Sequence, residues 1–135
     1  GTSGEGMKYE EIKELRELTD NILQGLRPSE DLRKPLGKII EKIGENKKAF
    51  KEFITPYLEK HSDDKELKCS SDELTKIFND LDNGTSHMNS YFTKEKRDEY
   101  LSEGLEEILK AVKELQKFQE HMTELLKKKK TSGKR

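Results

Sequence analysis

The stretch that decides the fold is residues 101–126, which read LSEGLEEILKAVKELQKFQEHMTELL. Apolar residues alternate here at spacings of four and three, which is the heptad seam of a helix that packs against other helices. The seam consists of Leu101, Leu105, Ile108, Val112, Leu115, Gln119, Met122 and Leu126, with Gln119 as its one polar member. Leu109, Phe118 and Leu125 widen this stripe. A wide stripe favours a helical bundle over a bare two-stranded coiled coil.

Apolar residues recur at helical spacing in three further segments. These segments are about 8–26, 29–61 and 71–92. The fourth helix is predicted over about 94–130, with Thr93 as its N-cap. No segment alternates convincingly with a period of two residues, so we expect no sheet. The sequence therefore predicts an all-α fold, an antiparallel bundle of four to five amphipathic helices.

The second segment, with Ser29 as its expected N-cap, contains two signals for a bend. Residues 44–46, Gly-Glu-Asn, separate two apolar stripes and predict a break or a bend. Pro56 lies inside the second stripe, where a proline removes a backbone donor and clashes with the preceding turn. We therefore expect a kink near Thr55 rather than a straight helix.

The third segment has two boundaries to place. Residues 62–70 are polar and predict a loop, with Ser70 capping the helix that follows. Asn83 and Gly84 form a dipeptide that is typical of turns and helix ends. The apolar spacing nevertheless continues loosely as far as Phe92. The helix either ends at Gly84 or continues to Phe92, and the spacing favours continuation.

Composition bounds the class of protein. The chain has 135 residues, of which 30% are hydrophobic and 41% are charged, with a net charge of −1. A near-zero net charge argues against a general nucleic-acid binder, and a single cysteine excludes an internal disulfide framework. No apolar run approaches the ~18 residues of a membrane span. We expect one helical domain over 8–130, a flexible lead or cloning remnant at 1–7, and a flexible tail at 131–135.

The sequence offers little catalytic or metal-binding chemistry. Its histidines, His61, His87 and His121, have no helical ligand spacing between them, and Cys69 alone cannot form a structural zinc site. Glycine-rich phosphate loops and nucleophile motifs are absent. We expect no catalytic residue, no metal and no cofactor. A metal-binding regulator that uses His61, Asp63 and Asp64 is the weakest alternative.

The first candidate for partner contact is a patch of aromatic, methionine and imidazole side chains. It consists of His87, Met88, Tyr91 and Phe92, within a segment that carries no charge from residue 83 to 93. Aromatic residues and methionine are enriched at protein interfaces. The competing interpretation, of about equal weight, is that these side chains close the end of the bundle.

The second candidate is the seam of the last helix, from Leu105 through Ile108, Val112, Leu115 and Gln119 to Met122. A polar residue in an apolar seam fixes register or pairing in some coiled coils. Gln119 therefore leaves a homodimer open as an expectation.

The composition and patterning of the predicted helices resemble those of a known group of proteins. The helices are rich in Lys and Glu, poor in Val and Ala and without Trp, and they lie between a Gly/Ser-containing lead and the lysine run 127–130. In composition and patterning over residues 8–130, the chain resembles the small helical surface lipoproteins of Borrelia spirochaetes. The resemblance implies display on the outer membrane through a lipid-bearing cysteine that this sequence does not contain. It also implies capture of host complement regulators such as factor H, or of matrix components.

Two function classes follow from these observations. The first is a non-enzymatic protein-binding module, the surface-exposed ectodomain of a helical lipoprotein that captures a host protein such as complement factor H. The alternative is a cytoplasmic coiled-coil scaffold or adaptor that pairs through its C-terminal helix. Neither function involves nucleic acid, and membrane contact is expected only through the lipid anchor.

Overall fold

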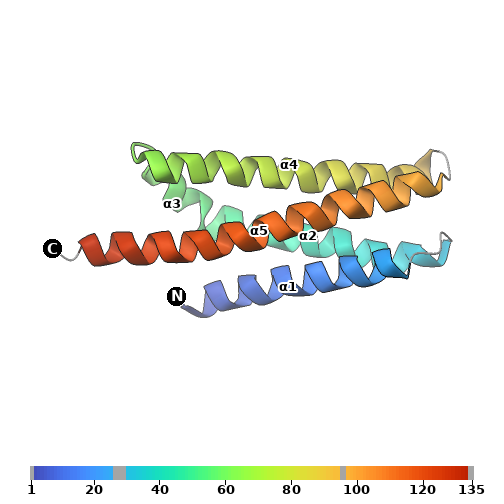
Figure 1. Cartoon of the computed structure of the whole chain (residues 1–135), viewed down its shortest axis with the longest axis horizontal. Helices are drawn as coiled ribbons and strands as arrows, with labels where there is room; N and C mark the ends of the chain where they lie inside the picture. Colours follow the sequence, from blue (N-terminus) through green and yellow to red (C-terminus); the bar gives the residue numbers. More distant parts are fainter. Residues whose placement is uncertain (1, 26–29, 95–96, 134–135) are drawn as a thin grey trace.

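The computed structural model describes the backbone of residues 2–25, 30–94 and 97–133 and the side chains of residues 12–25, 31–94 and 97–128. Within these ranges the chain is all-α and contains no strand (Figure 1). The four long helices are α1 (Thr2–Gln24), α2 (Arg33–Phe53), α4 (Lys65–Thr93) and α5 (Asp98–Gly133). A short 3-10 helix, η1 (Glu30–Leu32), precedes α2, and the six-residue helix α3 (Thr55–Lys60) follows it. The predicted all-α bundle is thereby confirmed.

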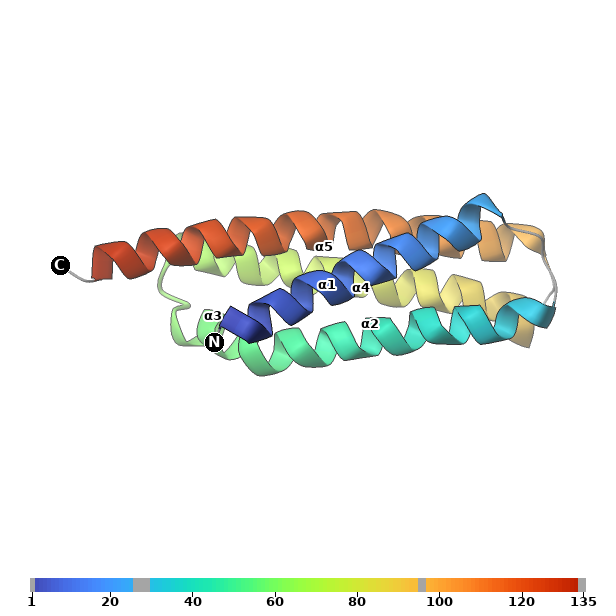
Figure 2. The ribbon, with the colours of Figure 1, turned by 90° about the horizontal axis from the view of Figure 1, so that it is seen from below.

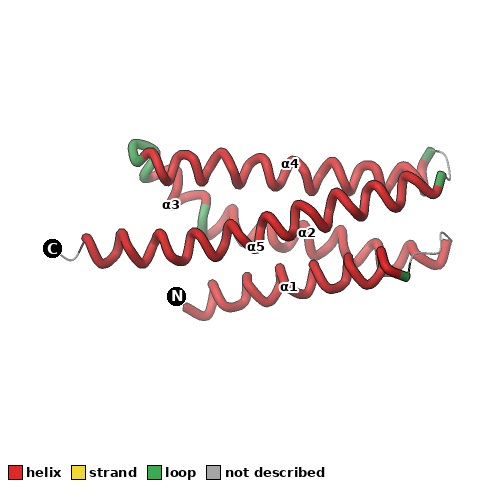
Figure 3. Tube along the Cα trace, in the orientation of Figure 1, coloured by secondary structure: helices red, strands yellow, loops and turns green. Residues whose placement is uncertain are grey.

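The long helices run up and down along one axis. α1 and α4 point in one direction and α2 and α5 in the other, so consecutive long helices are antiparallel (Figure 1). α1 crosses α2 and α5 obliquely, as the view from below shows (Figure 2). Helices account for nearly the whole described chain (Figure 3). This is the arrangement expected of an up-and-down four-helix bundle.

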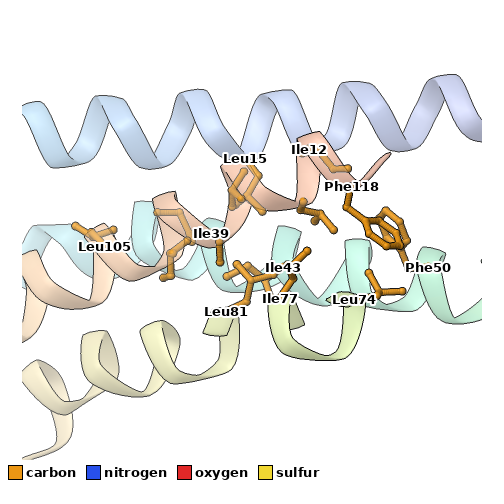
Figure 4. Close-up of a cluster of buried hydrophobic side chains, with 14 of the residues drawn as sticks. Ile12, Leu15, Ile39, Ile43, Phe50, Leu74, Ile77, Leu81, Leu105 and Phe118 are labelled. Carbon is orange, nitrogen blue, oxygen red and sulfur yellow. The ribbon is translucent and has the colours of Figure 1, made fainter. Parts of the chain in front are cut away.

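One apolar core lies between the four long helices. Ile12 and Leu15 of α1 face side chains from the other three helices, among them Ile43 of α2, Ile77 of α4 and Phe118 of α5 (Figure 4). The ring of Phe50 packs against two aromatic neighbours, with centroid distances of 5.8 Å to Phe78 and 6.1 Å to Phe118. Burial of these side chains is the main favourable contribution to the fold.

α4 and α5 approach so closely that their backbones touch. α4 continues through Gly84 to Thr93, which confirms the favoured continuation of the third helix. A Cβ atom on Gly104 would lie 2.7 Å from the carbonyl oxygen of Gly84 and 2.7 Å from the amide nitrogen of Met88. A glycine in a helix interior usually weakens it. Here two glycines admit a helix crossing that no larger residue allows.

Of the break or bend predicted at Gly44-Glu45-Asn46, the break is wrong, because α2 runs through these residues without interruption. Asn46 is fully buried, and its Nδ2 donates to the carbonyl oxygen of Lys42 at 2.8 Å. The side chain therefore bonds inside its own helix instead of ending it. The expected kink near Thr55 is confirmed, since Ile54 separates α2 from α3 and Pro56 lies in the first turn of α3.

Two predicted helix starts are also wrong. Residues 65–70 are helical, not part of a loop, because Asp64 caps α4 with a carboxylate that accepts from the N–H groups of Glu66 and Leu67. Ser70, the expected cap, is buried inside the helix. Thr93 does not cap α5 but ends α4, where its hydroxyl donates to a carbonyl of the preceding turn.

The outer ends of the bundle extend beyond the apolar stripes. α1 begins at Thr2, ahead of the predicted residue 8, and α5 continues to Gly133, past the predicted residue 130. Adding residues to an existing helix costs far less free energy than starting a new one. A helix can therefore continue beyond the residues that pack against its neighbours. The expected cap Ser29 lies outside the described residues. None of the described helices combines the length and the apolar character that a membrane span needs.

Candidate functional site

The four residues of the predicted patch, His87, Met88, Tyr91 and Phe92, differ in their exposure to solvent. Met88 is 0% exposed and Tyr91 is 6% exposed, so both belong to the core. They fall on the inward stripe of α4, four and seven residues after Gly84, because a helix returns to the same face at these spacings. Assigning them to a partner-binding surface was therefore wrong. Of the four residues, only His87 is exposed, and Phe92 is partly buried.

Phe92 closes one end of the bundle. Its ring meets Tyr91 edge to face, with centroids 5.0 Å apart. The guanidinium carbon of Arg33, at the start of α2, lies 4.7 Å from the centroid of the Phe92 ring. This is a cation–π contact between the beginning of α2 and the end of α4. The structural interpretation of the patch therefore holds for Met88, Tyr91 and Phe92.

The seam of α5 faces inward along its length. Leu105, Ile108, Val112 and Leu115 are fully buried, Met122 is 3% exposed, and Gln119 is 8% exposed. Their neighbours are the other helices of the same chain. The proposed pairing seam is therefore already filled within the bundle. A second copy could reach it only if the bundle opened.

A polar groove lies between α4 and α5 and includes the exposed member of the predicted patch. It has a volume of about 470 Å³ and is lined by Lys76, Asp80, Asn83, Ser86 and His87 of α4 and by Glu107, Lys110 and Ala111 of α5. Nδ1 of His87 lies 2.8 Å from Oε1 of Glu107, which joins the two walls across 20 positions of sequence. On the α4 wall, Nζ of Lys76 lies 3.3 Å from Oδ2 of Asp80. Side chains of both charge signs thus line one open groove on two rigid helices.

This groove fits the recognition of a polar surface. The contact between His87 and Glu107 fixes the imidazole through one ring nitrogen and leaves the other for a partner group. Lys110 adds a donor, and Asn83 offers both a donor and an acceptor. Side chains held on helices are positioned more accurately than side chains on loops. The arrangement can therefore make several directional hydrogen bonds at once.

The structure also bears on the hypothesis that His61, Asp63 and Asp64 bind a metal ion. No group of three His, Cys, Asp or Glu side chains that could hold a metal occurs within the described residues. The His61 ring packs on Tyr57, with centroids 4.5 Å apart, and the Asp64 carboxylate caps α4. The weakest sequence alternative is therefore not supported. Cys69 is an exposed free thiol on α4.

The acidic and basic members of this groove are not among the residues predicted from the sequence. Glu107 immediately precedes the buried Ile108, just as His87 immediately precedes the buried Met88. In two antiparallel helices with facing seams, residues that flank the seam on the same side meet at a shared edge. The position of each residue directly before a buried seam residue therefore indicates that His87 and Glu107 can meet. That meeting requires the third and fourth predicted helices to be neighbours.

Two further grooves occur among the described side chains. One, the α2–α4 groove, has a volume of about 400 Å³ and is lined by Lys47, Lys48 and Lys51 of α2, Thr55 at the start of α3 and Phe78 of α4. The other, of about 280 Å³, lies between α1 and α5, where Nη1 of Arg16 donates to Oε1 of Gln116 at 2.6 Å. The three grooves differ in charge, because carboxylates line the α4–α5 and α1–α5 grooves but not the α2–α4 groove.

Comparisons of the chain with protein-family models, with curated proteins and with solved structures give no match.

Proposed function

We propose that this chain is a non-enzymatic protein-binding module that holds its partner across the α4–α5 groove. The observation that carries the proposal is the juxtaposition of His87 and Glu107, 2.8 Å apart, in an open groove of mixed charge. The compositional resemblance to spirochaetal surface lipoproteins gives the partner class, a host serum protein such as complement factor H. On this proposal the bundle is displayed at the cell surface by a lipid anchor.

The groove supports this proposal in two ways. Its walls are held together by glycine-mediated backbone contact at Gly84 and Gly104, so the polar side chains keep their spacing when a partner arrives. Its charges are partly exposed, with 48% of the His87 side chain and 38% of the Glu107 side chain accessible. Exposed complementary charges govern the rate and specificity of association more than they add affinity. A strong dependence on salt follows from such contacts.

The scaffold alternative has less support. It needs the seam from Leu105 to Met122 to face a partner helix, and that seam is buried inside the chain. An intact bundle would have to lose α1 or α4 before α5 could pair. No specific contact within the described residues favours this opening.

The test is retention of serum proteins on the immobilised chain, identified by mass spectrometry at low and at physiological salt. We expect one complement or matrix protein to be enriched, and we expect less of it at higher salt. The groove variant is Lys76→Glu with Lys110→Glu, which reverses two charges of the lining. It should lose most of the retained protein.

The matched control is Lys68→Glu with Lys117→Glu, which makes the same charge change on the same two helices outside the groove. It should retain the serum protein as the unmodified chain does. Equal loss in both variants would point to general charge attraction instead of this groove. An eluate without any enriched protein would refute the capture of a serum protein.

A further inference from the structure

The groove between α2 and α4 differs in chemistry from the one proposed above. α2 contributes three lysines within two helical turns, Lys47, Lys48 and Lys51, and α4 contributes the ring of Phe78. No carboxylate is among the side chains that line it. α2 and α4 also contact each other less than α4 and α5 do, so this edge of the bundle is the more open one.

The lysines of this groove are not neutralised equally. Nζ of Lys47 lies 3.0 and 3.2 Å from the two carboxylate oxygens of Asp82, which holds the ammonium beside α4. Lys48 and Lys51 are exposed and form no ion pair within the part of the chain that the structure describes. Two lysines without an ion pair therefore border the groove.

The apolar part of the groove is recessed. Phe78 is partly buried, and its ring packs edge-on against Phe50 at a centroid distance of 5.8 Å. The alkyl stems of lysines extend such an apolar surface while their charged ends stay in water. A partner that uses this ring must project an apolar side chain into the groove from outside.

We infer that the α2–α4 groove docks an acidic segment of another protein, one that presents an apolar side chain flanked by carboxylates. The carboxylates would pair with Lys48 and Lys51, and the apolar side chain would cover Phe78. A simple anion would leave the ring unused. A flat bilayer surface would not reach a recessed ring. This inference goes beyond the proposed function and holds or fails independently of the α4–α5 groove.

The experiment is a fluorescence-anisotropy titration with a labelled peptide in which Phe and Leu are interspersed among glutamates. Two comparison peptides replace either every glutamate by glutamine or both apolar residues by serine. We expect saturable binding of the first peptide, weakened by salt, and weaker binding of both comparison peptides. Lys48→Glu with Lys51→Glu should lower the affinity for the first peptide by about tenfold or more.

Two controls keep this result specific. Lys113→Glu with Lys117→Glu, on the exposed face of α5, makes the same charge change and should leave peptide binding unchanged. Lys76→Glu with Lys110→Glu, which disables the α4–α5 groove, should also leave it unchanged. Circular dichroism of each variant establishes that the bundle is intact.

Three outcomes would overturn the inference. The Lys48 and Lys51 variant could bind the acidic peptide as well as the unmodified chain does. The glutamine peptide could bind equally well, which would remove charge as the cause. Finally, the chain could sediment with phosphatidylserine vesicles through Lys48 and Lys51 and not bind the peptide. Lipid headgroups would then be the ligand of this groove.

Discussion

Gly84 and Gly104 meet where α4 crosses α5, and each occupies the space that a side chain on the other would need. A Cβ atom on Gly84 would lie 2.9 Å from the carbonyl oxygen of Gly104, and one on Gly104 would lie 2.7 Å from that of Gly84. The contact fixes the distance between the two helices. It thereby also sets the width of the groove in which His87 meets Glu107.

Gly104→Ala should destabilise the bundle despite the better helix propensity of alanine. The added methyl group would meet backbone atoms of Gly84 and Met88, which cannot rotate away as a side chain can. Overpacking of this kind costs about 1–3 kcal/mol, which exceeds the gain of about 1 kcal/mol from replacing glycine in a helix. The measurement is the urea midpoint of unfolding followed by circular dichroism.

The matched control is Gly37→Ala in α2, where a Cβ atom would have no neighbour within 4 Å. This variant should gain about 0.5–1 kcal/mol, because only the helix propensity changes. An unchanged or raised midpoint for Gly104→Ala would show that α4 and α5 move apart without cost.

Asn46→Leu should stabilise the bundle by about 1 kcal/mol. Asn46 is fully buried, and its Oδ1 has no hydrogen-bond partner among the described residues. Leucine has the same branched shape and removes the desolvation cost of that oxygen. The free energy of unfolding checks this, with Asn79→Leu on the exposed face of α4 as the control. A loss of stability would show that the amide makes an interaction that leucine cannot replace.

Leu115→Asp should unfold the chain instead of separating two copies. Leu115 is fully buried in the α5 seam, and a carboxylate there would be stranded among apolar neighbours at a cost of about 3 kcal/mol or more. Sedimentation equilibrium of the unmodified chain should give a monomer, and circular dichroism of the variant should show lost helix. Lys113→Asp, on the exposed face of the same helix, should change neither. A folded monomeric Leu115→Asp variant beside a dimeric unmodified chain would restore the scaffold hypothesis.

Cys69 should react with a thiol reagent at full stoichiometry in the folded state. Its side chain is exposed on α4, so no opening of the bundle is needed. The reaction followed by absorbance should proceed at the same rate with and without mild denaturant. A rate that rises with denaturant would show that the thiol is covered. Cys69→Ser should leave the unfolding midpoint unchanged, because an exposed thiol contributes little to packing.

The helical stripes were predictable because they report burial directly. The seam from Leu101 to Met122 repeats at helical spacing, and each of its members is buried as that spacing requires. The kink before Pro56 followed from the missing backbone donor of proline. These features depend on local chemistry and need no knowledge of neighbouring helices.

The errors arose where tertiary contacts override local preference. Asn46 lies in a predicted helix break, but it is buried among the packed helices and its amide bonds within α2. The site depended on pairing as well. His87 belongs to the predicted aromatic cluster, but its groove partner Glu107 comes from another helix, and the sequence alone does not connect the two residues.

The glycine contact between α4 and α5 has a consequence for the chemical lifetime of the chain. In a flexible loop, Asn83 followed by Gly84 would cyclise readily, because the glycine nitrogen attacks the asparagine side chain and expels ammonia. Here that nitrogen belongs to the α4 helix, and Gly84 is wedged against α5. The dipeptide is thus protected for as long as the helices stay together. Deamidation at Asn83 would then accumulate only in molecules whose bundle has opened, as a slow covalent record of that opening.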